Sequence, residues 1–355
     1  MDIYLNFYKY YNLGKRMKRE EIITGLEKSD IDNIKQHELE NNYESPEFIS
    51  YPEPIRFNYK FKDLKQEAKV KVYRYGVLSI KTTFNYEVDS LEQLHELIKN
   101  NDINKNAENE FDKLYDKISD NFTSLFKENF ELFSHTYSIY CIDNSNIGEA
   151  YDLVNKNKDI VISLLTEEYD NMNFSEEQKK SVLDYNISFF NSDYTTIYWN
   201  NALIIDNNSN FNDKLFVIEL ANIQFNVLKT YDEYIDQHLS DYLITNNKKI
   251  TNIIPFFKSG ISKKIDEIMK LRFELEKVVD VMDNFEKFQG EWYLARVYYR
   301  ASKAFQIDRW RNLIENRIKK VNELYNLINS EINRKRMLWL NILMLLLFIL
   351  WFLGI

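Results

Sequence analysis

The chain has 355 residues, a formal net charge of −9 and 28% charged residues. This length is sufficient for two soluble units with sizeable cores, and the acidic balance excludes a protein whose main task is to coat nucleic acid, so no direct DNA binding is expected. Glycine and proline number only 7 and 4, which predicts long elements with few breaks.

The N-terminal half predicts an α+β domain over residues 1–207. Polar and apolar residues alternate on both sides of Tyr75-Gly76, as in two strands joined at a glycine. The polar segment 27–54 contains three prolines and is expected to be a loop. The other expected elements are strands at 55–61 and 135–143, helices at 90–100 and 109–130, and a short helix followed by strands at 175–206, whereas residues 150–169 are ambiguous.

The region 212–336 predicts a domain of long helices. Residues 212–244 have helical periodicity, and two apolar seams with heptad-like spacing follow at 268–285 and 314–332. Gly290 is the breaker between the seams, so the simplest geometry is an antiparallel helical hairpin. Each seam packs either on its partner helix, as in a coiled coil, or on another subunit, and a homo-oligomer is expected.

Residues 337–355 differ from the rest of the chain because they carry no charge and one clearly polar side chain, Asn341. As a helix, about 19 residues reach about 28 Å, close to the thickness of the hydrocarbon core of a bilayer. Met337 opens the segment, and Trp339 and Trp351 lie towards its two ends, where aromatic rings favour the membrane boundary. A transmembrane helix is therefore expected, in preference to a buried helix of a soluble protein.

Three cations, Arg334, Lys335 and Arg336, directly precede this span. By the positive-inside rule they hold that side, and the soluble body before it, in the cytoplasm. The expected location is the bacterial inner membrane, with a single tail anchor, and no glycine or proline interrupts 291–353, so one helix is expected to enter the membrane. Asn341 is either solvated at the interface or hydrogen-bonded to its copies in neighbouring subunits.

The residues that carry chemistry form no catalytic or cofactor motif. The glycines are too dispersed for a phosphate-binding loop, the four histidines are far apart, and Cys141 is alone, so no cofactor, metal or enzymatic activity is expected. Asp232 and Asp236 lie one helical turn apart, as a pair of metal ligands or, in preference, on a solvated face. Three polar residues interrupt an apolar helix and are expected to hydrogen-bond other helices in the core: Glu219, Asn222 and Gln224.

The helix and span at 305–353 resemble the C-terminus of the family that includes the mitochondrial "required for meiotic nuclear division" protein. The matching pieces of the helix are Ile314, Arg317, Val321, Asn322, Leu324, Leu327, Asn333 and Arg336, and "VKVYRYGVLSI" at 70–80 is similar to that family's first strand pair. The span lacks the Leu-Glu-Trp step and the later glutamate of that family. The resemblance implies an oligomeric, membrane-anchored protein without catalytic residues, with a cytoplasmic protein or ribonucleoprotein as its partner.

The order of an α+β domain, long helices and a span is also similar to CorA-type magnesium channels, although the Gly-Met-Asn signature is missing. Together these features predict a non-catalytic, single-span membrane protein whose partners are the lipid bilayer and its own copies, and whose cytoplasmic body serves as an oligomeric scaffold or tether. The alternative is a subunit of a divergent CorA-like ion channel or a membrane-acting stress or defence effector.

Overall fold

The structure is a computed structural model, and the chain divides into two compact units. The first unit comprises Met1–Thr230 and Val278–Arg309, and the second comprises Tyr231–Lys277 and Trp310–Ile355. The residues that the structure describes are 1–14, 16–29, 54–61, 64, 66–100, 103–122, 132–145, 149–170, 173–184, 186–206, 211–246, 269–270, 273 and 292–354. Within these ranges, side chains are not described at 237–246, 321, 324–325, 327–329 and 331–332.

The first unit is built on an eight-stranded sheet with the order β2-β3-β4-β1-β5-β8-β7-β6. Neighbouring strands are antiparallel except β5 and β8, which are parallel. The strands are β1 (Asp2–Asn12), β2 (Ile55–Lys60), β3 (Glu67–Tyr73), β4 (Val77–Glu87), β5 (Ser134–Asp143), β6 (Asn186–Ile187), β7 (Tyr194–Ile197) and β8 (Asn201–Asp206). The predicted strand pair around Gly76 is confirmed, and this glycine has a φ of 78°, which favours a residue without a Cβ.

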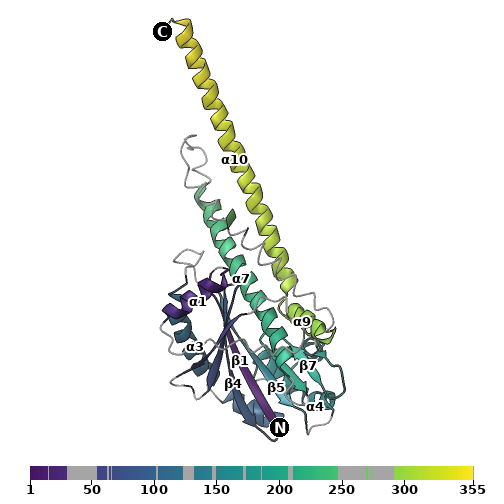
Figure 1. The fold of residues 1–355 in the computed structure, drawn as a ribbon. Coiled ribbons are helices and arrows are strands. Elements are labelled where there is room, and N and C mark those ends of the chain that lie inside the picture. The colour runs from purple at the N-terminus through teal and green to yellow at the C-terminus, as the bar shows by residue number, and fades with distance from the viewer. Residues whose placement is uncertain are drawn as a thin grey trace. The chain divides into compact units, whose positions relative to one another are not determined.

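Strand β1 lies inside the sheet, between β4 and β5, and nearly all of its residues are buried. Successive side chains of a strand point to opposite faces, so both faces of β1 must be covered. On one face, the ring of Phe7 lies 5.7 Å from that of Phe111 in α3 (Ile103–Ser119). On the other face, the ring of His135 in β5 lies 5.1 Å from that of Phe225 in α7 (Asn212–Asn246). Helices α3 and α7 therefore lie on opposite faces of the sheet (Figure 1).

The remaining helices of the first unit complete these two layers. Helix α3 begins six residues before the expected 109, because Ala107 extends its buried apolar side with Phe111, Leu114 and Ile118. The ambiguous segment 150–169 forms two short helices that are separated at Asn157. The bounds are α1 (Arg19–Lys28), α2 (Leu91–Lys99), α4 (Ala150–Lys156), α5 (Lys158–Thr166), α6 (Glu176–Leu183) and α9 (Trp292–Ala304).

No glycine or proline interrupts 291–353, and one helix was expected to continue into the apolar segment. One helix does so, but it begins only after a turn at Phe305-Gln306 and does not reach back to 291. Gln306 has a φ of 54°, in the left-handed region, and α10 (Ile307–Phe352) starts after it. Phe305 is 1% exposed, and its ring lies 5.3 Å from that of Tyr137 and 6.0 Å from that of Phe225. Burial of this ring in the first unit stabilises a turn that contains neither glycine nor proline.

The second unit contains the later part of α7 and most of α10. Arg317 of α10 ion-pairs with two aspartates of α7, with 2.8 Å between its Nε and Oδ1 of Asp232 and a second contact to Asp236. Helix α10 thus packs on α7 at this point. The seam at 268–285 lies outside the described residues apart from 269–270 and 273, as does most of the expected loop at 27–54, and the coiled coil stays a prediction.

The α+β architecture of the N-terminal part, the helices that follow it and one apolar helix at the end of the chain agree with the fold class expected from the sequence. The structure divides the chain into compact units at Thr230 and Arg309. This division is of a different kind and does not test the domain boundaries expected at 207, 212 and 337. The sequence-based domain boundaries stay a prediction.

Candidate functional site

The last part of α10 is an uninterrupted apolar surface. Within the described chain, one helix is long and apolar enough to cross a membrane, at Asn333–Phe352, and none of it is buried. Its 20 residues correspond to about 30 Å of helix. The apolar side chains from Met337 to Leu353 are exposed by 43% to 79%. A contiguous apolar surface of this size indicates a membrane or another apolar partner.

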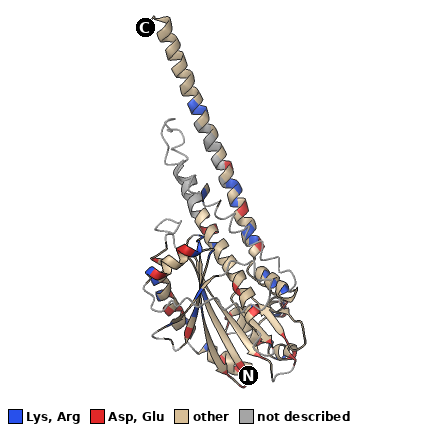
Figure 2. Cartoon of the chain, viewed as in Figure 1, with Lys and Arg blue, Asp and Glu red and all other residues tan. Residues whose placement is uncertain are grey.

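The residues predicted to flank and anchor this segment all lie in α10. Arg334, Lys335 and Arg336 occupy the helical turn directly before Met337, and Figure 2 shows the uncharged end of α10 directly after a basic segment. Trp339 and Trp351 are 52% and 75% exposed. They are twelve residues apart, which corresponds to about 18 Å along a helix. Asn341 is exposed, and its side chain forms no hydrogen bond with the described part of the chain, so both interpretations of this residue stay predictions.

Glu219 of α7 holds the helix on the sheet through a buried ion pair. Its side chain, 1% exposed, contacts the ammonium of Lys71 and accepts hydrogen bonds from Tyr73 Oη at 3.0 Å and Ser79 Oγ at 2.8 Å. Burial alone raises the pKa of this carboxyl, but Lys71 and the hydroxyl donors outweigh burial and hold the pKa below its usual range. Glu219 is therefore an ionised, saturated acceptor with a structural role.

Asn222 and Gln224 have separate partners. The Oδ1 of Asn222 lies 3.0 Å from His135 Nε2, so the amide oxygen accepts a proton that this nitrogen carries. Burial lowers the pKa of His135 to about 4, which keeps the imidazole neutral near pH 7. Gln224 Oε1 accepts the hydroxyl proton of Tyr298 in α9. Hydrogen bonding between helices was expected, and it is found for Gln224, whereas for Glu219 and Asn222 the expectation was wrong because α7 packs on a sheet.

Asp232 and Asp236 were expected on a solvated face or, alternatively, as metal ligands. The structure places both against Arg317, and Asp232 is 6% exposed. The solvated face is therefore wrong for Asp232, because a helix that follows much later in the chain covers it. Among the residues that the structure describes, no group of three or more His, Cys, Asp or Glu side chains is placed to hold a metal ion.

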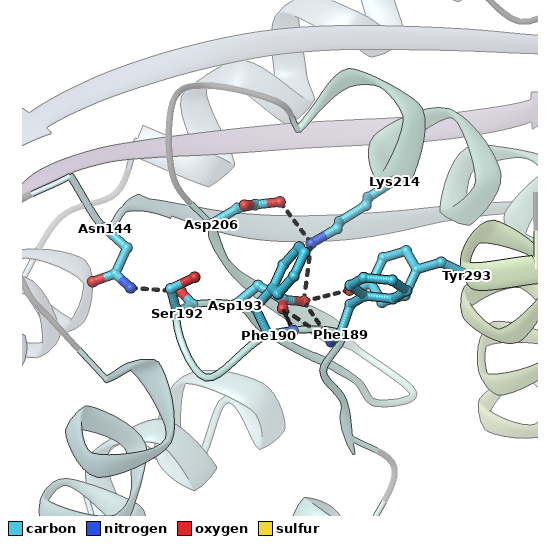
Figure 3. Close-up of polar contacts among 8 residues, drawn as sticks. All are labelled: Asn144, Phe189, Phe190, Ser192, Asp193, Asp206, Lys214 and Tyr293. Atoms are coloured by element: carbon cyan, nitrogen blue, oxygen red, sulfur yellow. Dashed lines mark hydrogen bonds and ion pairs between the residues drawn. The ribbon is translucent and has the colours of Figure 1, made fainter.

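A second polar cluster, not found from the sequence, joins the start of α7 to α9 (Figure 3). Lys214 Nζ lies 2.8 Å from Oδ2 of Asp206 and 3.7 Å from Oδ2 of Asp193. Asp193 also accepts the backbone N–H of Phe189 at 2.9 Å and the hydroxyl of Tyr293 at 2.8 Å. Burial alone lowers the pKa of Lys214, but Tyr293 and Asp206 raise it above its ordinary value. A saturated, charged lysine of this kind stabilises the fold and supplies no free base.

The sequence offers little signal for this cluster. Asp193 and Tyr293 are 100 residues apart, and neither residue type is unusual in its local segment. Lys214 and Asp206 are closer, but the end of a strand and the start of a helix meet only when the sheet has formed. A search for polar residues inside apolar periodicity therefore finds Glu219 and misses Lys214.

Comparison with known proteins assigns the sheet-containing part of the chain. Residues 3–212 match the family model described as the N-terminal domain of uncharacterized protein MJ0711, and this match covers more than half of the chain. The chain belongs to this family. A member of the MJ0711 family from Methanocaldococcus jannaschii, itself described as uncharacterized, is 23% identical over 248 residues, which is 70% of this chain and 72% of the relative. No solved structure matches the chain.

The MJ0711 N-terminal domain, placed on this structure, covers β1 to β8 and ends at the first residue of α7. The strands that carry Lys71, Tyr73 and Ser79 lie inside it. Glu219, Lys214 and the whole of α10 lie beyond it. The family domain thus corresponds to the sheet and its first helical layer, while the helix that covers the second face comes from the following segment.

Proposed function

We propose that this protein is a membrane-anchored scaffold or tether without catalytic activity, in which the end of α10 lies in a lipid bilayer. The observation that carries the proposal is the continuous exposed apolar surface from Met337 to Leu353. Water does not favour such a surface, whereas a bilayer about 30 Å thick matches its length. The polar clusters support a non-catalytic body, because their charged groups are paired and saturated.

The orientation follows from the basic turn before the span. Arg334, Lys335 and Arg336 favour the cytoplasmic side, which supports the proposal that the sheet-containing body lies in the cytoplasm and the span in the bacterial inner membrane. A reporter protein fused to the N-terminus tests this assignment. We expect a fluorescent protein that folds only in the cytoplasm to be active there. An alkaline phosphatase that is active only outside the cytoplasm should remain inactive, and the opposite pattern would refute the orientation.

Two further proposals concern self-association of the protein and the partner that it holds at the membrane. Asn341 is a polar, exposed side chain in a segment that otherwise presents apolar groups, and in a bilayer such an amide is best satisfied by its copy in a neighbouring span. This supports a homo-oligomer with parallel spans. The resemblance to the family of the mitochondrial meiotic division protein adds the proposal of a cytoplasmic protein or ribonucleoprotein partner, which an oligomeric tether would hold at the membrane.

Deletion of residues 337–355 tests the anchor. We expect the truncated protein to move from the membrane pellet to the soluble fraction, with the circular dichroism of a folded α+β protein. The matched control replaces the same residues by an apolar sequence of leucine and alanine of equal length, which we expect to restore the membrane fraction. If the truncated protein stays in the membrane pellet, the anchor is not this segment and the proposal is wrong.

Self-association has its own test. Asn341→Leu keeps the span apolar and removes the amide, so the protein should remain in the membrane while crosslinking between copies decreases. Leu340→Asn combined with Asn341→Leu moves the amide by one position, from 341 to 340, and serves as the control. Equal crosslinking in all three proteins would show that the amide does not join the spans.

A further inference from the structure

Two exposed phenylalanines and one side of α9 form an aromatic surface on the first unit. Phe189 and Phe190, in the loop between β6 and β7, are 55% and 66% exposed, and Trp292 and Tyr299 of α9 are 60% and 56% exposed. The ring of Phe189 lies 4.6 Å from that of Phe190 and 6.3 Å from that of Trp292. Tyr299 follows Trp292 by about two helical turns and therefore lies on the same side of α9. We call these four residues the aromatic patch.

A buried carboxylate fixes the position of the two phenylalanines. Asp193, which is 4% exposed, accepts the backbone N–H of Phe189 at 2.9 Å and that of Phe190. Lys214 and Tyr293 contact the same carboxylate (Figure 3). The fold therefore holds two apolar rings in water through a buried charged cluster, although exposure of such rings is unfavourable. This arrangement is typical of a surface that binds a partner.

The size of the aromatic patch limits what it can bind. Single exposed aromatic side chains are common on proteins, but four that are 55% to 66% exposed present on the order of 500 Å². The largest apolar patches on monomeric proteins reach about 300–600 Å² and are often functional. Each partner in a stable protein–protein interface contributes about 800 Å². The aromatic patch therefore suits a short segment of a partner better than a second copy of this chain.

Two arginines accompany the rings on α9. The guanidinium of Arg296 lies 4.7 Å from the ring centroid of Trp292, and Arg300 follows one helical turn later. Both arginines are partly exposed. Neither of them forms an ion pair with the part of the chain that the structure describes. Their charges are therefore available to carboxylates of a partner.

The geometry favours a peptide over a single-stranded nucleic acid. Nucleic acids bind through open aromatic faces and several phosphate contacts. Here Arg296 covers one face of Trp292, and Lys303, which ion-pairs with Asp308, lies 5.3 Å from the ring centroid of Tyr299. Two arginines are also few for a phosphate backbone. Aromatic rings together with arginine are, in contrast, the composition of the centre of protein–protein interfaces.

We propose that the aromatic patch, with Arg296 and Arg300, binds a short segment of a partner protein in which an apolar side chain is flanked by acidic residues. The apolar side chain packs on the rings, and the carboxylates pair with the guanidinium groups. The inference rests on the proposed tether and deepens it, because it gives the chemistry of the partner that the tether holds. The surface lies within the first unit, so binding can be measured without a membrane.

Selection from a phage-displayed library of short random peptides, on the full chain in neutral detergent, tests the proposal. We expect the selected peptides to share leucine, phenylalanine or tryptophan next to aspartate or glutamate. A fluorescein-labelled peptide of the selected sequence is then the probe, and its affinity is measured by fluorescence anisotropy. Phe189→Ser/Trp292→Ser and Arg296→Glu/Arg300→Glu should each bind it at least about tenfold more weakly than wild type, because each variant removes central contacts.

Matched controls change the same kinds of side chain on other helices. Leu97→Ser removes an exposed apolar side chain from α2, and Lys28→Glu/Lys117→Glu reverses two exposed cations of α1 and α3. Both controls should bind the peptide as wild type does. All variants keep residues 337–355 and should stay in the membrane pellet, so a failure of peptide binding is distinguishable from a failure of the anchor.

Several results would overturn the proposal. They are the absence of an enriched sequence, enriched peptides without acidic residues, equal binding by all variants, and loss of binding together with a lower melting temperature. Oligouridine is the second probe, and binding that Arg296→Glu/Arg300→Glu abolishes would identify a nucleic acid as the occupant instead. Self-association in detergent that Phe189→Ser/Trp292→Ser abolishes would identify a second copy of this chain instead.

Discussion

Two aspartates in the middle of the apolar segment should release this protein from the membrane. Leucine, isoleucine and phenylalanine occupy 12 of the 17 positions from 337 to 353. On a scale of insertion into membranes, each contributes about −0.3 to −0.6 kcal/mol near the centre of a helix, so together they contribute about −4 to −7 kcal/mol. Leu343→Asp and Leu347→Asp add about 5 to 7 kcal/mol and remove about 1 kcal/mol of favourable transfer. The double variant therefore loses the whole driving force for insertion.

The assay is extraction of membranes with alkaline carbonate, followed by quantification of the protein in the pellet and the supernatant. Wild-type protein should stay in the pellet, and the double aspartate variant should be in the supernatant. Leu343→Ala/Leu347→Ala is the matched control, because it changes the same positions without adding charge and should stay in the pellet. Equal retention of the aspartate variant and the alanine control would refute the reasoning, since a bilayer distinguishes these side chains strongly.

Three further predictions concern the folded body and are measured as free energies of unfolding of the full chain in detergent. Glu219→Gln should cost about 3 kcal/mol, because it leaves the partly buried ammonium of Lys71 without its counter-charge. Double substitution with Lys71→Met should cost less than the single change, and an equal or larger cost would contradict the ion pair. His135 has a folded pKa of about 4 against an unfolded value of about 6.5, so its contribution is present above pH 6.5 and is lost as the pH falls towards 4. Because His135 is partly exposed, we expect this loss of stability to be about 1 to 2 kcal/mol. His135→Gln should remove this pH dependence. An unchanged pH profile in that variant would assign the effect to other groups. Gln306→Gly should stabilise the protein by about 1 kcal/mol because it relieves the left-handed backbone, whereas Gly76→Ala should destabilise it for the same reason, and changes of the opposite sign would refute the assigned turns.

The sequence alone indicated the elements whose signal is local. Residues 337–353 are apolar on every side, and that property requires no partner to be recognised. The alternation around Gly76 predicted a strand pair, and the structure has β3 and β4 there. The periodicity of 212–244 predicted a long helix, and α7 runs from Asn212 to Asn246. Hydropathy and periodicity report which sides of an element are apolar, so they are sufficient for these three elements.

The sequence also indicated that three polar residues of α7 are buried, but not what they contact. Glu219 and Asn222 were assigned to bonds between helices, and they bind β3, β4 and β5 instead. A buried polar group must have a partner, yet the sequence does not say which of many distant donors supplies it. The same limit applies to Asp232, whose partner Arg317 is 85 positions further along the chain.

Only the tertiary structure decided the order of the strands and the break at Gln306. Gln306 adopts a left-handed conformation because Phe305 is buried against the sheet. Hydropathy and periodicity act within one element and are visible in the sequence, whereas register and burial are set by contacts between elements, which form only when the chain folds.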